Sequence, residues 1–182
     1  MDPACYERVF VNDRVIVWVA VEGATWSELE SGAPDLARAG AERLSSTRLL
    51  LLGTIRRDGS PRISPIEPFF TDTDLVVGAM AWSLKARDLA RDPRYAAHTT
   101  VSGPHSGEGE LKLYGRALAA SDEAREAATG GWWLEAREGA ASVFVLRIFS
   151  AVYVEWDYEQ GQMTVLRWSP GDGFSRRTRS YP

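Results

Sequence analysis

The stretch from Gly53 to Tyr95 constrains the fold of this chain more than any other. Within it, two apolar segments meet at Arg57-Asp58-Gly59-Ser60. An Asp-Gly pair between alternating runs is a strong signal for a β-hairpin. The second segment is interrupted by Pro61, Pro65 and Pro68. Because proline donates no hydrogen bond to a ladder, we expect this strand to lie at a sheet edge or beside a ligand.

A third strand and a short basic helix follow the hairpin. Asp74 to Met80 contains the apolar run LVVGAM and is predicted as a strand. Trp82 to Leu89 then opens a helix, with Ser83 as its cap, and Pro93 ends it. A helix start offers free N–H groups, so it suits a phosphate.

The cations near this helix start support the same prediction. Lys85 and Arg87 lie in the first turn, where acidic residues are normally preferred, and local rules are most often broken at functional sites. Arg62 lies one strand away and is expected to converge with them. We predict a phosphate-binding role for these three residues. Arg56, Arg57 and Arg91 are interpreted as solvated cations on the hairpin and helix faces.

The remaining elements indicate the fold class. Two short helices are expected from the Thr25-Trp26-Ser27-Glu28 capping-box pattern and from Pro34, and another from Ser121 to Thr129. Further strands are predicted over Arg48–Arg57, Tyr95–Val101, Glu110–Ala120, Val143–Trp156 and Gln162–Trp168, and a short helix over Trp132–Arg137. Most connections are too short for helices between parallel strands. The prediction is therefore a mainly β protein (α+β by helix content), a six- to seven-stranded antiparallel split β-barrel with small peripheral helices.

Three regions are expected along the chain. Residues 1–24 form an N-terminal extension, whose apolar run Val15–Val21 is far too short to span a membrane and is either an extension from an upstream start or an added edge strand. Residues 25–170 form one split-barrel domain, and residues 171–182 form a polar basic tail. The four leucines Leu49 to Leu52 predict that both faces of their strand are buried or that one meets a partner chain.

Composition excludes several classes of function. The net charge is −4 with a pI of about 5.3, which argues against a sequence-independent nucleic-acid binder. The single cysteine, Cys5, rules out an internal disulfide framework and a cysteine-based zinc site. Neither a metal site nor a membrane segment is predicted, and a cytoplasmic location is expected.

Two motifs carry a resemblance to a known family. The hairpin GTIRRDGSPRISPI fits the pattern T-x-x-x-D-G-x-P, and the helix SLKARDLARDPR fits K-x-R/K-N/D-L-x-x-D-P-R. In this order and at this separation they resemble the pyridoxamine 5'-phosphate oxidase-like, FMN-binding split barrels. The resemblance covers roughly Thr25 to Trp168 and is densest from Leu50 to Thr100.

The resemblance implies a cofactor site and a homodimer. The flavin ring would lie along strands Arg62–Ile66 and Val77–Met80, with its phosphate at Lys85 and the neighbouring residues. Trp156 or Trp168 of the partner subunit would complete each of two interface sites. The cofactor-binding residues expected on this basis are Arg62, Ser64, Pro65, Ala79, Met80, Trp82, Ser83, Lys85 and Arg87. The pair Ser83-Leu84 departs from relatives that carry a further basic residue there, and Asp88 replaces a common Asn.

Three functions remain open on the sequence. The first is an FMN-dependent oxidoreductase acting on an unknown small molecule; no catalytic residue is assigned, because a flavin carries its own hydride chemistry. The second is a reductase using the deazaflavin coenzyme F-420. The third is a non-catalytic flavin or haem binder, with His98 as a minority candidate for the haem ligand. The segment Gly103–Gly107 does not fit a hydrolase elbow, because its serine is one position late.

Overall fold

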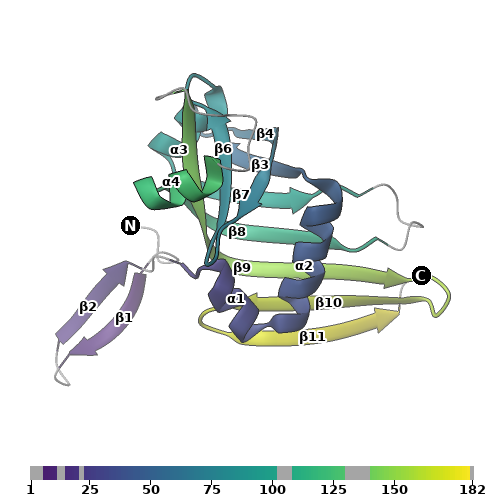
Figure 1. Cartoon of the computed structure of the whole chain (residues 1–182). Helices are drawn as coiled ribbons and strands as arrows, with labels where there is room; N and C mark the ends of the chain where they lie inside the picture. The colour runs from purple at the N-terminus through teal and green to yellow at the C-terminus, as the bar shows by residue number, and fades with distance from the viewer. Residues whose placement is uncertain (1–5, 12–14, 21–22, 102–107, 130–139, 181–182) are drawn as a thin grey trace.

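The protein folds around a nine-stranded antiparallel sheet that curls into a split barrel (Figure 1). The computed structural model describes residues 6–11, 15–20, 23–101, 108–129 and 140–180, with side chains from residue 23 onward. The predicted fold class is confirmed. The sheet has more strands than expected because it includes a short strand after the hairpin and the C-terminal tail. The strands of this sheet are β3 (Leu50–Ile55), β4 (Pro61–Ile66), β5 (Pro68–Phe70), β6 (Leu75–Met80), β7 (Arg94–Thr99), β8 (Glu110–Ala119), β9 (Ala141–Asp157), β10 (Gln162–Ser169) and β11 (Gly173–Ser180).

The predicted Asp-Gly hairpin joins β3 to β4. Gly59 has a φ of 84°, which an L side chain rarely adopts, and its N–H donates to the carbonyl of Arg56 at 2.9 Å. The backbone N–H of Ser60 donates to the Asp58 carboxylate at 2.9 Å, so the turn is closed twice. Strand β4 pairs with β3 alone among the described strands, as its prolines required.

Strand β9 closes the barrel because it is long enough to serve three neighbours. Its first part pairs with β6 (Met80↔Ala141), its middle with β8 and its end with β10 (Gln162↔Asp157). A bulge between Tyr114 and Gly115 bends the β8–β9 ladder. The sheet order is β11-β10-β9-β8-β7-β3-β4, and β4 has no ladder to β6, so the barrel is split between these two strands.

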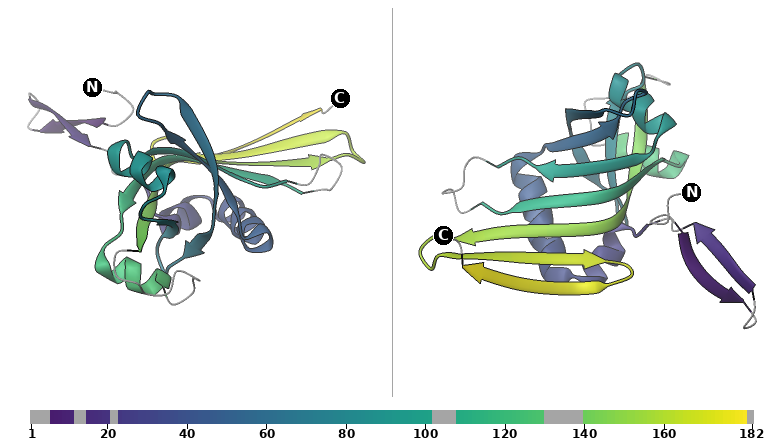
Figure 2. Two further views of the ribbon diagram at one scale, coloured as in Figure 1. Left: turned by 90° about the horizontal axis from the view of Figure 1, so that it is seen from above. Right: turned by 180° about the vertical axis from the view of Figure 1, so that it is seen from behind.

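Among the described residues, four helices lie around the sheet: α1 (Trp26–Gly32), α2 (Pro34–Thr47), α3 (Leu84–Arg91) and α4 (Asp122–Thr129). The predicted capping box forms, since Thr25 Oγ1 accepts from the Glu28 N–H at 3.1 Å and the Thr25 N–H donates to Glu28 Oε2 at 2.7 Å. Helices α1 and α2 cover one face of the extended β8–β11 sheet (Figures 1 and 2). Within the described ranges, no helix or strand covers the opposite face, which is called the uncovered face below.

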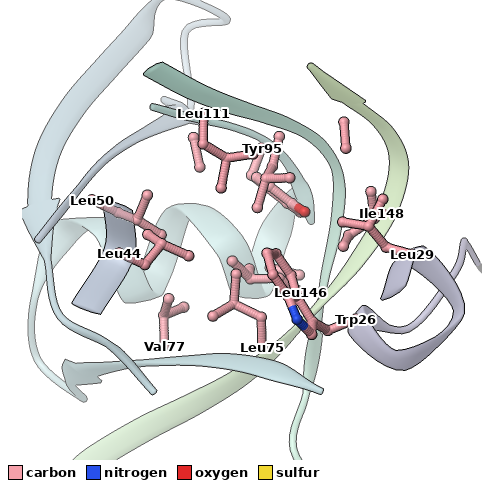
Figure 3. Packing of buried hydrophobic residues seen from close by; sticks show 14 of the residues in the cluster. Trp26, Leu29, Leu44, Leu50, Leu75, Val77, Tyr95, Leu111, Leu146 and Ile148 are labelled. Atoms are coloured by element: carbon pink, nitrogen blue, oxygen red, sulfur yellow. The ribbon is translucent and has the colours of Figure 1, made fainter. Parts of the chain in front are cut away.

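The larger of two clusters of buried apolar residues fills the space between the helices and the curled sheet (Figure 3). Helix α2 contributes the buried side chains Leu36 and Leu44. Trp26 meets Phe70 edge-on at 4.9 Å between ring centroids. Trp168 is also buried here, directly against Gly32, where an added Cβ would lie 2.4 Å from the indole nitrogen.

Both ends of the chain differ from the sequence-based expectation. Residues 173–180 of the expected tail form β11, an edge strand paired along its whole length with β10 (Ser169↔Gly173). At the other end, β1 (Tyr6–Val11) pairs with β2 (Val15–Ala20) in a separate two-stranded sheet, so the apolar run is not an added edge strand of the barrel. The helix expected over Trp132–Arg137 and the loop with His105 lie outside the described residues.

The alternation of side chains along β3 explains the run of leucines from Leu49 to Leu52. Leu50 and Leu52 are fully buried, whereas Leu49 and Leu51 are partly exposed on the uncovered face. The two-residue period of a strand therefore divides the run between the core and the surface. Of the two predicted explanations, only a face that meets a partner chain remains open.

Candidate functional site

The candidate site lies at the split of the barrel, where β4, the end of β6 and the start of α3 come together. Ser83 caps α3, as predicted, because its side chain accepts from the Ala86 N–H at 3.4 Å. The loop before it is short, since the Ser83 N–H bonds the Met80 carbonyl at 2.8 Å. This turn fixes the first turn of the helix directly after the last residue of β6.

Lys85 bridges the split. Its ammonium donates to the carbonyl of Pro65 at 2.5 Å, on the edge strand β4. Partial burial lowers the pKa of Lys85, and the carboxylate of Glu67 opposes that shift. A partly desolvated ammonium whose partner here is a backbone carbonyl is available for a stronger, anionic acceptor.

Large apolar side chains that are close to Lys85 or Pro65 in the sequence are exposed to solvent. Ile63 is 74% exposed, Trp82 68% and Leu84 55%. Each lies within a few residues of Lys85 or of the Pro65 carbonyl that it contacts. Exposed apolar groups of this size beside a cation mark a ligand or protein contact surface.

The other predicted residues occupy different environments. Ala79 is buried at the end of β6, and Met80 is half-buried. Ser64 and Arg62 stand opposite the buried residues Leu52 and Thr54, so they share the inner face of the sheet. Pro65 lies on the other face, with Ile63.

The three predicted phosphate-binding cations do not converge on one point. Lys85 and Arg87 are two residues apart, roughly 200° around the helix, and project in different directions. Arg62 and Arg87 line a hollow of about 960 Å³ between the β3–β4 turn and α3, whereas Lys85 faces the Pro65 carbonyl. Sequence reasoning expected Arg62 to converge with Lys85 and Arg87, but the structure brings Arg62 together with Arg87 and directs Lys85 elsewhere.

Asp88 organises the inner side of this region. Its side chain is only 5% exposed. One carboxylate oxygen accepts from Arg62 Nε at 2.6 Å and from the Thr54 hydroxyl at 3.1 Å, and the other accepts from Arg91 at 3.3 Å. Burial acts to raise the pKa of Asp88, but these three bonds outweigh it and hold the pKa below its usual value.

Sequence reasoning missed the roles of Asp88, Thr54 and Arg91. Asp88 was noted only as a departure from a family pattern, and Arg91 was interpreted as a solvated cation. In the structure Arg91 also donates to the carbonyl of Ile55, so it ties α3 to β3. The available signal was the i, i+3 spacing of Asp88 and Arg91, which predicts a contact on one helix face.

His98 lies on the uncovered face with both ring nitrogens engaged. Nδ1 is 2.5 Å from the Thr99 carbonyl, and Nε2 is 3.0 Å from Glu110, which Lys112 also contacts. A haem ligand requires a free ring nitrogen, so this arrangement does not present one. Trp168 is likewise unsuited to its predicted role, because it is buried in the core of its own chain. Trp156 is half-buried and stays a prediction.

Two general features bear on the class of protein. Among the described residues, no group of three His, Cys, Asp or Glu side chains is placed to hold a metal ion. In the same part of the chain, no helix combines the length and the apolar composition needed to cross a membrane.

Comparisons with known proteins agree on the fold. The sequence matches no family model and no curated protein. Among solved structures, PhzG from Burkholderia lata 383, in complex with tetrahydrophenazine-1-carboxylic acid, superposes with a TM-score of 0.60 at 14% identity, over 81% of this chain and 89% of that one. A pyridoxamine 5'-phosphate oxidase-related, FMN-binding protein from Nostoc punctiforme gives 0.58 at 12% identity, over 81% and 96%.

Haem-binding proteins occur among the similar structures as well. A haem-binding protein from Mycobacterium smegmatis gives a TM-score of 0.50 at 15% identity, over 79% of this chain and 88% of that one. The structural neighbours are thus pyridoxamine 5'-phosphate oxidase-related FMN-binding proteins and haem-binding proteins of the split-barrel fold. The chain shares that fold.

Proposed function

We propose that this protein is an FMN-binding oxidoreductase that transfers a hydride between the flavin and a small molecule. The observation that carries the proposal is the partly desolvated Lys85 ammonium on the Pro65 carbonyl, with the exposed Trp82 and Ile63 side chains a few residues away. A phosphate ester attached to a flat apolar ring needs this combination of a cation and apolar surface. The FMN-binding neighbour of the same fold supports the choice of ligand.

Different residues at the split would bind the phosphate and the ring of the flavin. Lys85 and the capped start of α3 would hold the phosphate, and the flavin, when bound, would supply the hydride chemistry. Pro65, on the same face of β4 as Ile63, and the half-buried Met80 at the end of β6 would line the ring. The side chains of Trp82 and Ile63 would exclude water from it.

We further propose that the protein works as a homodimer. The exposed Leu51, Ile63 and Tyr114 share the uncovered face. Strand pairing sets Tyr114 in one row across the sheet with Ala96, Gly53 and Ile63. Leu51 is two residues from Gly53 on β3, so its side chain lies on the same face, in a row with His98 and Lys112. A second copy on this face would cover these side chains and the open side of the site. An obligate interface of this kind buries more than roughly 2,000 Å² in total.

Cofactor identity is tested first by the absorbance spectrum of the purified protein. An oxidised flavin, a deazaflavin and a haem absorb at different wavelengths, so the spectrum separates FMN from F-420 and haem. For protein without a bound chromophore, FMN is titrated by fluorescence quenching. A haem spectrum, or failure to bind FMN, would refute the proposal.

The Lys85→Ala variant tests the site itself. Loss of one charge-assisted hydrogen bond is expected to weaken FMN binding by about 1.5–3 kcal/mol, or roughly tenfold to 150-fold. Arg91→Ala is an unsuitable control because Arg91 anchors Asp88 and Ile55. Arg38→Ala on α2 serves instead, since Arg38 is exposed and makes only surface ion pairs. Equal weakening in both variants, or in neither, would show that the phosphate lies elsewhere.

A further inference from the structure

A second, strongly basic hollow lies on the inner side of α3, away from the Lys85 ammonium. It has a volume of about 960 Å³ and is lined by five arginines, two aspartates and Leu84. The arginines are Arg56, Arg57, Arg62, Arg87 and Arg91. Five cations against two carboxylates leave three positive charges in a chain whose net charge is −4. The hollow is therefore positively charged, although the molecule as a whole is negatively charged.

Only some of these arginines are paired with carboxylates of the protein. Asp88 engages Arg62 and Arg91, and the Asp58 carboxylate is held by Ser60 within the turn. Within the part of the chain that the structure describes, the side chains of Arg57 and Arg87 make no hydrogen bond or ion pair. Two guanidinium groups thus face the hollow with their donors free.

The walls of the hollow are held in place before any ligand arrives. The buried Asp88 carboxylate fixes Arg62 Nε at 2.6 Å, and Arg91 donates to the Ile55 carbonyl. Arg62 is also fixed by strand pairing, because it stands directly opposite Thr54. Guanidinium groups fixed in this way lose little side-chain entropy when they bind an anion.

We propose that this hollow binds a ligand with two or more linked phosphate groups, such as the diphosphate of a nucleotide. Guanidinium groups bind phosphate through paired N–H donors, and cations from the β3–β4 turn and from α3 together offer more donors than one phosphate can accept. Leu84, 55% exposed at the same hollow, provides apolar contact for the organic part of the ligand. The site is separate from the proposed flavin site, since Lys85 does not line it.

The test is calorimetric titration of the full-length protein with inorganic pyrophosphate at fixed ionic strength. Arg57→Ala and Arg87→Ala change exposed side chains that make no hydrogen bond or ion pair with the described residues, so both variants should fold normally. Each is expected to weaken pyrophosphate binding by about tenfold or more. The matched control is Arg176→Ala. Arg176 is exposed on β11, at the opposite end of the sheet, and its side chain makes no hydrogen bond or ion pair with the described residues.

The outcomes separate this site from the flavin site and from unspecific attraction. The proposal is supported if Arg57→Ala and Arg87→Ala weaken binding while Arg176→Ala and Lys85→Ala do not, and if added FMN leaves the pyrophosphate affinity unchanged. It is overturned by the absence of saturable binding or by equal weakening in Arg176→Ala. Competition by FMN, or loss in Lys85→Ala, would show that a single anion site serves both ligands. Binding of inorganic phosphate as tight as that of pyrophosphate would refute the requirement for linked phosphates.

Discussion

Replacing Asp88 by Asn tests whether the buried carboxylate holds α3 on the barrel. Asparagine keeps the shape and an oxygen acceptor for Thr54, but it removes the negative charge beside Arg62 and Arg91. The Arg62 contact is short and largely desolvated, whereas Arg91 is 39% exposed at 3.3 Å and contributes less. Breaking a buried ion pair from one side costs about 3–5 kcal/mol, and the hydrogen bonds that Asn retains place this variant near the lower end, at about 3 kcal/mol.

The measurement is urea unfolding of the wild type and the variant at neutral pH. In thermal unfolding, the same loss of about 3 kcal/mol lowers the Tm of a chain of this length by roughly 6–12 °C. Asp92→Asn is the matched control, because Asp92 also pairs with an arginine, Arg94, whose side chain is 53% exposed. That variant should lose no more than about 1 kcal/mol. A loss below about 1 kcal/mol in Asp88→Asn, or equal losses in the two variants, would refute the reasoning.

The difference in stability between the wild type and Asp88→Asn should depend on pH. Because the folded pKa of Asp88 is held below its unfolded value of about 3.9, its contribution to stability is fully present above that pH. It is lost as the pH falls through the folded pKa, when the carboxylate is protonated. The stability difference between wild type and Asp88→Asn should therefore be constant from pH 7 to about pH 5 and shrink below about pH 4. A difference that persists unchanged in strong acid would show that the charge is not its cause.

Two further substitutions test the sheet. Gly115→Ala should cost about 3 kcal/mol in urea unfolding, because the added Cβ would lie 1.8 Å from the Arg147 carbonyl oxygen at the β-bulge; Gly171→Ala, with no atom within 4 Å, should be nearly neutral. Tyr114→Arg should dissociate the proposed dimer in sedimentation, since it places a charge on the uncovered face. Phe174→Arg is equally exposed in the single chain, and it is paired with buried Trp168, so it lies on the other face and should leave the dimer intact; a dimer that survives Tyr114→Arg would exclude that face.

Much of the local structure was determined by the sequence alone. The Asp-Gly turn, the capping box of α1 and the Ser83 cap of α3 depend on interactions between residues a few positions apart, and each forms as predicted. The edge position of β4 also followed from local chemistry, because proline cannot donate to a second neighbouring strand. The antiparallel barrel followed from short connections between alternating strands.

Tertiary structure decided which side chains meet. The spacing of Lys85 and Arg87 indicated a basic helix start, but only the docking of α3 against β3 and β4 directs one toward Pro65 and the other toward the arginine hollow. The bond from Arg62 to Asp88 joins residues 26 positions apart, and no local pattern specifies such a pair. The sequence predicted a polar tail at the C-terminus, because an edge strand exposed on both faces shows no apolar alternation. Only pairing with β10 makes these residues a strand.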